Sequence, residues 1–195
     1  MAYVLGFWFA DGYMRHEKSY RIVFSSNDAD ILLKIRECLN CDYPLYRGKN
    51  RKDCQLIIFS KRMYFKLLGL GGKRCKSKTM NFPQVPQKYL ADFVRGFFDG
   101  DGSVFYTTYI HTKIKRPRTE LRSNFTAGNP GFLYDLQNVF SETLGFLRKK
   151  VCSFNDGNSW KLGYGTYDTI KLLKFMYYPN YPIGLDRKAS FAKQI

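Results

Sequence analysis

The feature that most restricts the fold of this chain is an internal repeat. The segment Leu5-Gly6-Phe7-Trp8-Phe9-Ala10-Asp11-Gly12 returns as Arg95-Gly96-Phe97-Phe98-Asp99-Gly100-Asp101-Gly102. The pattern of apolar spacing that follows the first copy also follows the second copy. The sequence therefore predicts two halves built on one plan and related by a pseudo-two-fold axis.

Each half continues beyond its motif with the same order of elements. A strand, a helix, a further strand and a last helix are predicted at residues 20–28, 31–39, 54–59 and 66–68, and again at 121–126, 132–140, 159–164 and 171–173. With a second strand added to each pair, at turns marked by Gly48 and Gly157, the order is αββαββα in each half. The predicted fold class is α+β, with a first half at residues 1–82, a linker at 83–88 and a second half at 89–195. Two prolines in the linker block helix and favour an extended connection.

The motif itself indicates close helix packing. Gly6 and Ala10 lie four residues apart on one helical face, as do Gly96 and Gly100, and small residues at this spacing let two helix backbones approach. We expect the glycine that follows each acid, at positions 12 and 102, to stop its helix in the left-handed conformation.

The two acids of the motif, Asp11 and Asp101, are then expected side by side at two helix ends. A helix carries partial negative charge at its C-terminal end, so a lone carboxylate there is disfavoured. A divalent cation is the natural compensation, and a cation beside a phosphodiester can activate water and stabilise the leaving oxygen.

Charge indicates the class of partner. The chain has 195 residues, 45% of them hydrophobic, with 32 Lys and Arg against 16 Asp and Glu, a formal net charge of +16. A globular protein of this charge favours a polyanion, because neutralised phosphates release counterions. No apolar run approaches the ~20 residues of a membrane span, and no basic amphipathic helix is clear. We interpret the apolar first ten residues as a structural helix.

The five cysteines do not form a disulfide pattern. Their odd number and scattered spacing indicate a reducing, intracellular compartment. Cys38 and Cys41 have the spacing of a metal or redox site, but a structural zinc needs four ligands and no second pair appears. We interpret them as buried cysteines near a helix end.

The two repeated segments resemble the signature motifs of single-chain LAGLIDADG homing endonucleases. Val4–Gly12 and Val94–Gly102 each align with the nine-letter motif, and the resemblance covers nearly the whole chain. It implies two motif helices packed at a central interface, saddle-shaped antiparallel sheets with helices on the convex side, and a concave face that follows the DNA major groove. It also implies that Asp11 and Asp101, with the carbonyls of Ala10 and Gly100, hold Mg²⁺, with Mn²⁺ or Ca²⁺ as substitutes.

The resemblance further implies a basic residue beside each active-site half. Residues 74–77 parallel residues 186–189, which makes Lys76 and Lys188 the candidates; an ordinary contact to the DNA backbone is the alternative for each. Asp99 has Phe9 as its counterpart, so we expect a structural or surface role for it. The glycine-rich residues 69–74 lack the spacing of a nucleotide-binding loop and are interpreted as a helix stop.

Candidate DNA contacts are the polar side chains of the predicted strands and turns. Within strands, residues two apart share a face, which separates Arg21 and Ser25 from Ile22 and Phe24. For each candidate, a phosphate contact or a solvated charge is favoured over a base reader. The candidates are Arg15, Lys18, Arg21, Ser25, Arg47, Lys49 and Gln55 in the first half, and Tyr106, Thr108, Lys113, Lys115, Arg122, Asn124, Arg148, Lys150 and Lys161 in the second.

The functional expectation is a Mg²⁺-dependent, site-specific endonuclease that acts as a monomer. It would recognise a long double-stranded DNA target, non-palindromic because the two halves differ in sequence, and cut each strand across the minor groove to leave short 3′ overhangs. The alternative is a maturase that assists intron RNA splicing, since such a protein can keep both acids. A transcription factor on this fold usually carries an added DNA-binding domain, for which the chain has no room.

Overall fold

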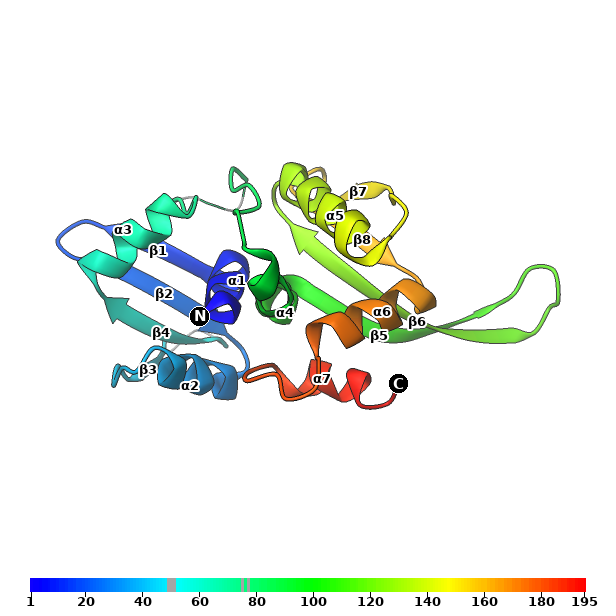
Figure 1. Ribbon diagram of the computed structural model, residues 1–195, viewed down its shortest axis with the longest axis horizontal. Helices are drawn as coiled ribbons and strands as arrows, with labels where there is room; N and C mark the ends of the chain where they lie inside the picture. Colours follow the sequence, from blue (N-terminus) through cyan, green and yellow to red (C-terminus); the bar gives the residue numbers. More distant parts are fainter. Residues whose placement is uncertain (49–51, 75, 77) are drawn as a thin grey trace.

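The computed structural model describes residues 1–48, 52–74, 76 and 78–195 and shows the repeat as two similar layered halves (Figure 1). The first half contains α1 (Ala2–Asp11), β1 (Gly12–His16), β2 (Tyr20–Ser26), α2 (Ala29–Cys38), β3 (Leu45–Arg47), β4 (Cys54–Phe59) and α3 (Lys61–Gly69). The second contains α4 (Leu90–Asp101), β5 (Gly102–Ile110), β6 (Pro117–Ala127), α5 (Pro130–Leu144), β7 (Val151–Phe154), β8 (Ser159–Tyr164) and α6 (Thr166–Met176). The predicted αββαββα order is confirmed. A 3₁₀ turn (Gln87–Tyr89) and a last helix, α7 (Asp186–Ala192), were not predicted.

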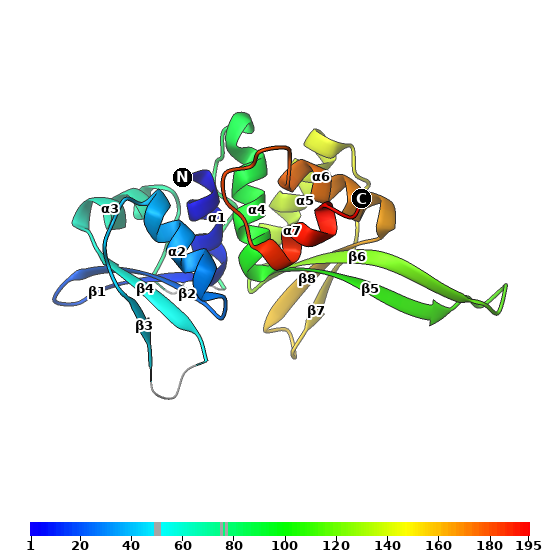
Figure 2. The same cartoon turned by 90° about the horizontal axis from the view of Figure 1, so that it is seen from below.

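Each half has one four-stranded antiparallel sheet. The strand orders are β1-β2-β4-β3 and β5-β6-β8-β7, so the two sheets have the same topology. Figure 2 shows the helices on one side of both sheets, with the strands curving away on the other side. The β5–β6 ribbon is longer than its counterpart β1–β2 and projects from the body of the protein (Figures 1 and 2). The predicted α+β class with two antiparallel sheets is confirmed.

The two motif helices cross at the centre, and glycines determine how close they come. A Cβ on Gly6 would lie 2.0 Å from the carbonyl oxygen of Phe93, and a Cβ on Gly96 would lie 2.1 Å from that of Tyr3. These two contacts are equivalent under the pseudo-two-fold axis. Any larger side chain at either glycine would therefore force the α1 and α4 backbones apart.

Gly12 and Gly102 end the helices, but not in the conformation expected from the sequence. Gly12 has φ −103° and ψ 161°, and Gly102 has φ −97° and ψ 164°, so both are extended. The expectation of left-handed caps was therefore wrong. Glycine is required for space: a Cβ would lie 2.2 Å from Trp8 Cδ1 at position 12 and 2.2 Å from Phe98 Cδ2 at position 102. The chain thus leaves each helix directly as the first strand of a sheet.

The apolar core continues through both halves because α1 and α4 carry apolar side chains toward both sheets. Phe7, Phe9 and Phe97 are each at most 2% exposed within one cluster that also includes residues of β2, β6 and the outer helices. Phe125 also points inward, and Ser123 beside it satisfies its hydroxyl with Thr169 Oγ1 at 3.0 Å. The predicted inward parity of this strand is confirmed.

Smaller sequence expectations have mixed outcomes. Gly157 has φ +80° in the β7–β8 turn, and α3 stops at Gly69, both as predicted. Cys38 and Cys41 do lie at the end of α2, but Cys38 is exposed and Cys41 only partly buried, because the helix end faces solvent; their predicted burial was wrong. The helices of the described residues are all too short or too polar to cross a membrane.

We predict that Gly6→Ala and Gly96→Ala each lower the free energy of unfolding by at least about 2–3 kcal/mol, because backbone atoms cannot yield to the new methyl group. Urea denaturation followed by circular dichroism measures this. Gly69→Ala is the matched control, since a Cβ there meets nothing within 4 Å. Equal stability of Gly6→Ala and Gly69→Ala would contradict the close crossing.

Candidate active site at the paired helix ends

The crossing of α1 and α4 brings the two motif acids together. Asp11 is the last residue of α1 and Asp101 the last residue of α4. A Cβ on Gly100 would lie 2.4 Å from Ala10 Cβ and 3.2 Å from Asp11 Oδ2, so the Asp11 carboxylate lies against the end of α4. A small residue at position 100 is what allows this approach.

Burial makes the two acids expensive to ionise. Burial raises the pKa of Asp11, against the opposing charges of Lys76 and Lys188. Burial and the neighbouring charge of Asp11 raise the pKa of Asp101 to about 7. Two carboxylates held this close disfavour each other's ionised form, so the site is suited to an added positive charge.

Lys76 reaches this site from the segment that follows α3. Its side chain is 5% exposed, and its Nζ donates to the carbonyl oxygens of Phe9 at 2.5 Å and Ala10 at 2.8 Å. These carbonyls belong to the last turn of α1, where a cation is favourable. Lys76 and Asp101 also line one small cavity of about 50 Å³. Burial lowers the pKa of Lys76 to about 8, while Asp101 and Asp11 favour its charged form.

Lys188 occupies the equivalent position in the second half, carried by α7. Its side chain is 3% exposed, and its Nζ donates to the carbonyl oxygens of Phe98 at 2.5 Å, Asp99 at 2.9 Å and Gly102 at 2.6 Å. Burial lowers the pKa of Lys188 to about 8 as well. The structure thus brings together the four side chains that the sequence singled out for chemistry.

The donor set fits a hard divalent cation that keeps part of its water shell. Within the described residues, no three His, Cys, Asp or Glu side chains gather as a metal site, so protein carboxylates would supply two ligands at most. Mg²⁺ is commonly held in this way, by one or two carboxylates with phosphate and water oxygens completing its shell. The Ala10 carbonyl, a predicted ligand, already accepts from Lys76, whereas in the described part of the chain neither Lys76 nor Lys188 donates to the Gly100 carbonyl.

Asp99 is buried, at 2% exposure, so the surface alternative for it was wrong. Its carboxylate accepts from Tyr3 Oη at 2.7 Å, Tyr177 Oη at 2.5 Å and the Leu185 amide at 2.8 Å. Burial raises the pKa of Asp99, and the three donors oppose this shift. Sequence reasoning missed these partners because nothing near the motif indicates which distant tyrosines reach it.

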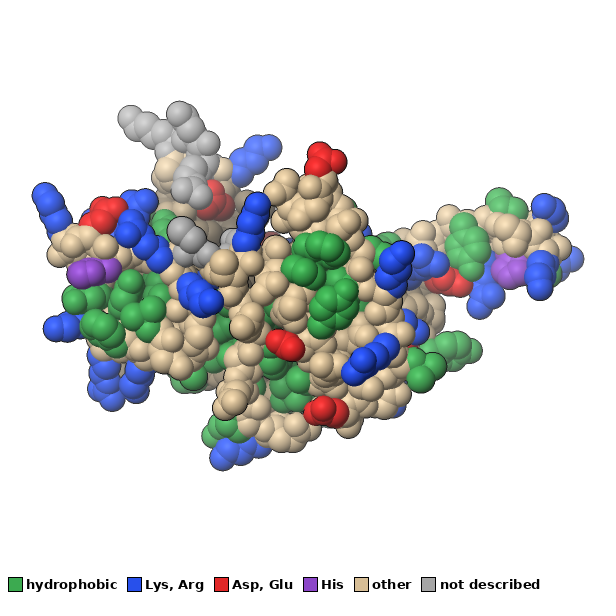
Figure 3. Space-filling model, turned by 90° about the horizontal axis from the view of Figure 1, so that it is seen from above, with side chains coloured by type: hydrophobic (Ala, Val, Ile, Leu, Met, Phe, Trp, Pro, Cys, Tyr) green, Lys and Arg blue, Asp and Glu red, His purple; other side chains and the backbone are tan. Residues whose placement is uncertain are grey.

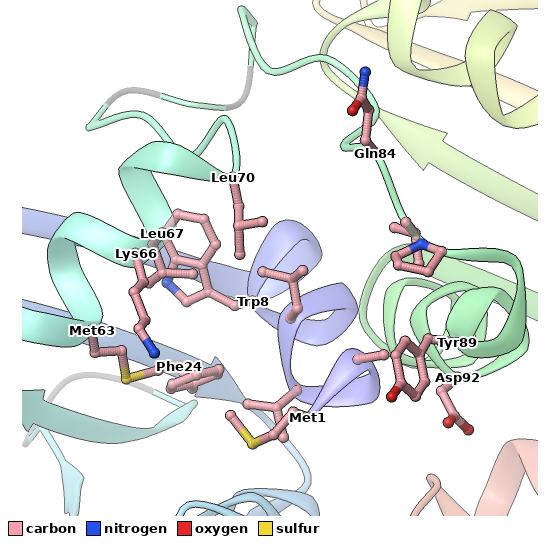
Figure 4. Close-up of a pocket in the computed structure, with 15 residues that line it drawn as sticks. Met1, Trp8, Phe24, Met63, Lys66, Leu67, Leu70, Gln84, Tyr89 and Asp92 are labelled. Atoms are coloured by element: carbon pink, nitrogen blue, oxygen red, sulfur yellow. The ribbon is translucent and has the colours of Figure 1, made fainter.

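A separate cavity of about 640 Å³ lies between α1, α3, the linker and the start of α4 (Figure 4), and neither Asp11 nor Asp101 is among the described residues that line it. Its walls are mainly apolar and include Trp8, Leu67, Leu70, Val85 and Tyr89. Lys66 and Asp92 are the charged side chains among its lining residues. This composition does not provide a constellation for bond cleavage.

The sheet face opposite the helices carries part of the predicted DNA-contact set. In the first half, strand pairing places Arg15 opposite Arg21 and Ser25 opposite Gln55, with Ile22 and Phe24 on the helix side. Lys18 lies exposed in the β1–β2 turn, and Lys49 lies outside the described residues. Arg47 pairs with the buried Cys54 and donates to its Sγ, so it shares the helix-side face and its predicted orientation was wrong.

In the second half the register divides the predicted set. Arg122, Asn124 and Lys161 lie on the face opposite the helices, while Lys113 and Lys115 lie exposed at the ribbon tip and Lys150 is exposed just before β7. Tyr106 pairs with the buried Leu121 and stacks on Phe191 of α7, at 5.7 Å between ring centroids.

Three of these predicted contacts face the helices. The first is Tyr106. The second is Thr108, whose hydroxyl forms a hydrogen bond with that of Thr119 on the same side of the sheet. The third is Arg148, which donates a hydrogen bond to the side chain of Asn138 in α5. They were placed on the wrong face because the pairing of β5, and the path before β7, cannot be read from alternation in a single strand.

The register also reveals side chains on the open face that were not predicted. Pairing places Ser103, Phe105, Thr107 and Tyr109 beside the open-face residues of β6, among them Arg118. Figure 3 shows Lys and Arg side chains over the first half and along the projecting ribbon. The residues paired with Arg122 and Asn124 face outward with them, but these partners can be identified only when the strand register is known.

No protein-family model and no curated protein matches the sequence. Solved structures do resemble it. The I-LtrWI LAGLIDADG homing endonuclease bound to target DNA has a TM-score of 0.63 at 13% identity, with 97% of this chain and 86% of that chain covered. The LAGLIDADG meganuclease I-AabMI bound to uncleaved DNA has a TM-score of 0.66 at 13% identity, with 98% and 90% covered. I-SmaMI bound to uncleaved DNA target in the presence of calcium ions has a TM-score of 0.66 at 12% identity, with 97% and 87% covered.

At these identities the likeness concerns the fold. It agrees with the two sequence motifs, with the two equivalent antiparallel sheets and with the central pair of motif helices. The protein therefore has the fold of the single-chain LAGLIDADG homing endonucleases.

Proposed function

We propose that this protein is a site-specific, divalent-metal-dependent DNA endonuclease. The observation that carries the proposal is the convergence of Asp11 and Asp101 with Lys76 and Lys188 at the paired helix ends. Each acid is followed at once by the first strand of its sheet, so the site lies between the two sheets. A polyanion spread across both sheets would pass over this point.

Double-stranded DNA is the substrate that this surface fits best. An antiparallel ribbon fits the major groove, and the β1–β2 and β5–β6 ribbons extend in opposite directions from the central helices α1 and α4 (Figure 1). The net charge of +16 favours binding to phosphate. The three similar structures described above are each bound to DNA. The two ribbons differ in length and sequence, which supports a non-palindromic target.

The chain's own residues would divide the work at the phosphodiesters. Asp11 and Asp101 would hold the cation, here Mg²⁺, with Mn²⁺ or Ca²⁺ able to take the same ligands. When bound, the metal would activate water and stabilise the leaving oxygen. The ammonium groups of Lys76 and Lys188 would each stabilise negative charge on the phosphate that faces their half of the site. Because each lysine has a pKa of about 8, it could also accept or donate a proton near neutral pH. One cut in each strand, with short 3′ overhangs, is the expected product of a single monomer.

The direct test is selection of cleaved sites from a randomised DNA duplex library with Mg²⁺. We expect one long, non-palindromic site to be recovered, with a cut in each strand. No cleavage of any duplex, together with salt-dependent binding to intron RNA, would contradict the proposal and favour the maturase role instead.

We predict that Asp11→Asn and Asp101→Asn each reduce cleavage of the selected site by about a hundredfold or more and leave DNA affinity within a few fold, because they remove a metal ligand and no DNA contact. Single-turnover cleavage and fluorescence anisotropy in Ca²⁺ measure the two quantities. Asp135→Asn, on the exposed face of α5, is the control. Full activity of either active-site variant would disprove the two-carboxylate assignment.

Metal-free stability should depend on Asp101. Its pKa of about 7 in the folded protein exceeds the unfolded value of about 4, so its contribution to stability falls as the pH rises from about 4 to about 7. In EDTA, Asp101→Asn should therefore raise Tm by roughly 5 °C at pH 8 and by less at pH 5. Scanning fluorimetry measures this, and Mg²⁺ should raise the Tm of the native protein more than that of the variant. An equal gain at both pH values would argue against the raised pKa of Asp101.

Lys76→Met and Lys188→Met should each slow cleavage by at least about tenfold, with a smaller effect on DNA affinity, because each loses the ammonium but keeps the buried alkyl chain. The same two assays separate the effects, and circular dichroism checks folding, since each lysine also caps a helix. Lys174→Met, exposed on α6, is the control. Equal losses in rate and affinity would reduce either lysine to a contact with the DNA backbone.

A further inference from the structure

The two lysines at the active site are held in different ways. Lys188 belongs to the helix α7, whereas Lys76 lies in the segment after α3 and outside any helix. At the position where α4 has Asp99, α1 has Phe9, which packs against Phe93 at 5.6 Å between ring centroids. A carboxylate anchor is therefore present in the second half and replaced by an aromatic ring in the first.

Asp99 connects its own helix to the start of α7. Its Oδ2 accepts from the backbone amide of Leu185, the residue that immediately precedes α7, and Lys188 lies one helical turn further on. The ammonium of Lys188 in turn donates to the backbone carbonyl of Asp99. Asp99 thus contacts both the residue that precedes α7 and the ammonium group of Lys188.

Two tyrosines complete this connection. Tyr177 Oη donates to Asp99 Oδ1 and comes from the end of α6, while Tyr3 Oη donates to Oδ2 and comes from α1. All three groups donate hydrogen bonds to the Asp99 carboxylate. These bonds stabilise it in a buried region, where an unpaired charge would be costly. Four chain segments therefore meet at this carboxylate: α1, α4, the end of α6 and the start of α7.

Arg95 secures the segment between α6 and α7 from the same face of α4. It is fully buried, and its Nε and Nη1 donate to the carbonyl oxygens of Ile183 and Met176, each at 2.7 Å. Its counterpart in α1 is Leu5, whose aliphatic side chain has no hydrogen-bond donor. Asp99 and Arg95 lie one helical turn apart and both contact the approach to Lys188, whereas their counterparts in α1, Phe9 and Leu5, are apolar.

We propose that Asp99 is a positioning residue for Lys188, and that its effect is confined to one of the two cleavage events. Asp99 does not touch the reacting atoms; it holds α7 so that the Lys188 ammonium stays beside the end of α4. This inference rests on the proposed endonuclease function for its consequence in cleavage, but the holding of Lys188 can be measured without DNA.

The first experiment measures the lysines directly, with the metal-free full chain. Brief labelling with an amine-reactive acetylating reagent, followed by mass spectrometry, compares the reactivity of Lys188 and Lys76. Asp99→Leu and Tyr177→Phe should raise the labelling rate of Lys188 by about threefold or more and leave Lys76 unchanged. Tyr167→Phe is the matched control, because this tyrosine of α6 is 88% exposed and the substitution removes a hydroxyl from the surface of the protein. Unchanged Lys188 labelling, or an equal rise at both lysines, would overturn the proposal.

The second experiment resolves the two strands of the selected DNA duplex, each labelled at one end. Asp99→Leu should slow the cut in the same strand that Lys188→Met slows, by about tenfold, and leave the other strand within twofold. The double variant should be no slower than Lys188→Met alone, since the two residues act through one ammonium. Asp99→Asn, which keeps an acceptor, should recover part of the rate.

The outcomes separate this inference from the proposed function. Selective exposure of Lys188 without any DNA cleavage by the native chain would sustain the positioning role and reject the endonuclease. Cleavage by the native chain with both strands slowed equally in Asp99→Leu would sustain the endonuclease and reject the positioning role. Because Tyr177→Phe removes one hydroxyl group only, it tests the same connection if Asp99→Leu fails to fold.

Discussion

The close crossing of α1 and α4 is the constraint on which the rest of the structure depends. Gly6 and Gly96 bring each helix against the backbone of the other, at distances that exclude even a methyl group. Because each helix runs directly into the first strand of its sheet, this crossing also sets the relation between the two sheets. The distance between the acids is a consequence of the same geometry, since Asp11 and Asp101 end the two helices.

That geometry concentrates negative charge, and two lysines from distant segments offset it. The ends of α1 and α4 carry carbonyl groups that lack a partner within the helix, as well as the two carboxylates. Lys76 and Lys188 donate to these carbonyls and favour the ionised form of the acids, and the acids favour the charged form of the lysines. The two lysines therefore offset the negative charge of both helix ends and of both acids.

Symmetry in the fold does not extend to the surroundings of the site. In place of Phe9 and Leu5 of the first half, the second half has Asp99 and Arg95, which fasten the chain between α6 and α7. The segment between α6 and α7 packs against α4, whereas the corresponding part of α1 borders an open apolar cavity (Figure 4). The duplicated plan thus leaves the two lysines in different surroundings.

The sequence by itself determined the repeat, the order of elements and the two motif acids, because these depend on spacing along the chain. Alternation also showed that Arg21 and Arg122 face away from the core, since successive side chains of a strand point to opposite sides. Only the tertiary structure decided the faces of Tyr106 and Arg47, the donors to Asp99 and the extended form of the glycines after each acid. These depend on strand register, on the path of long connections and on the atoms of distant residues, which no local pattern contains.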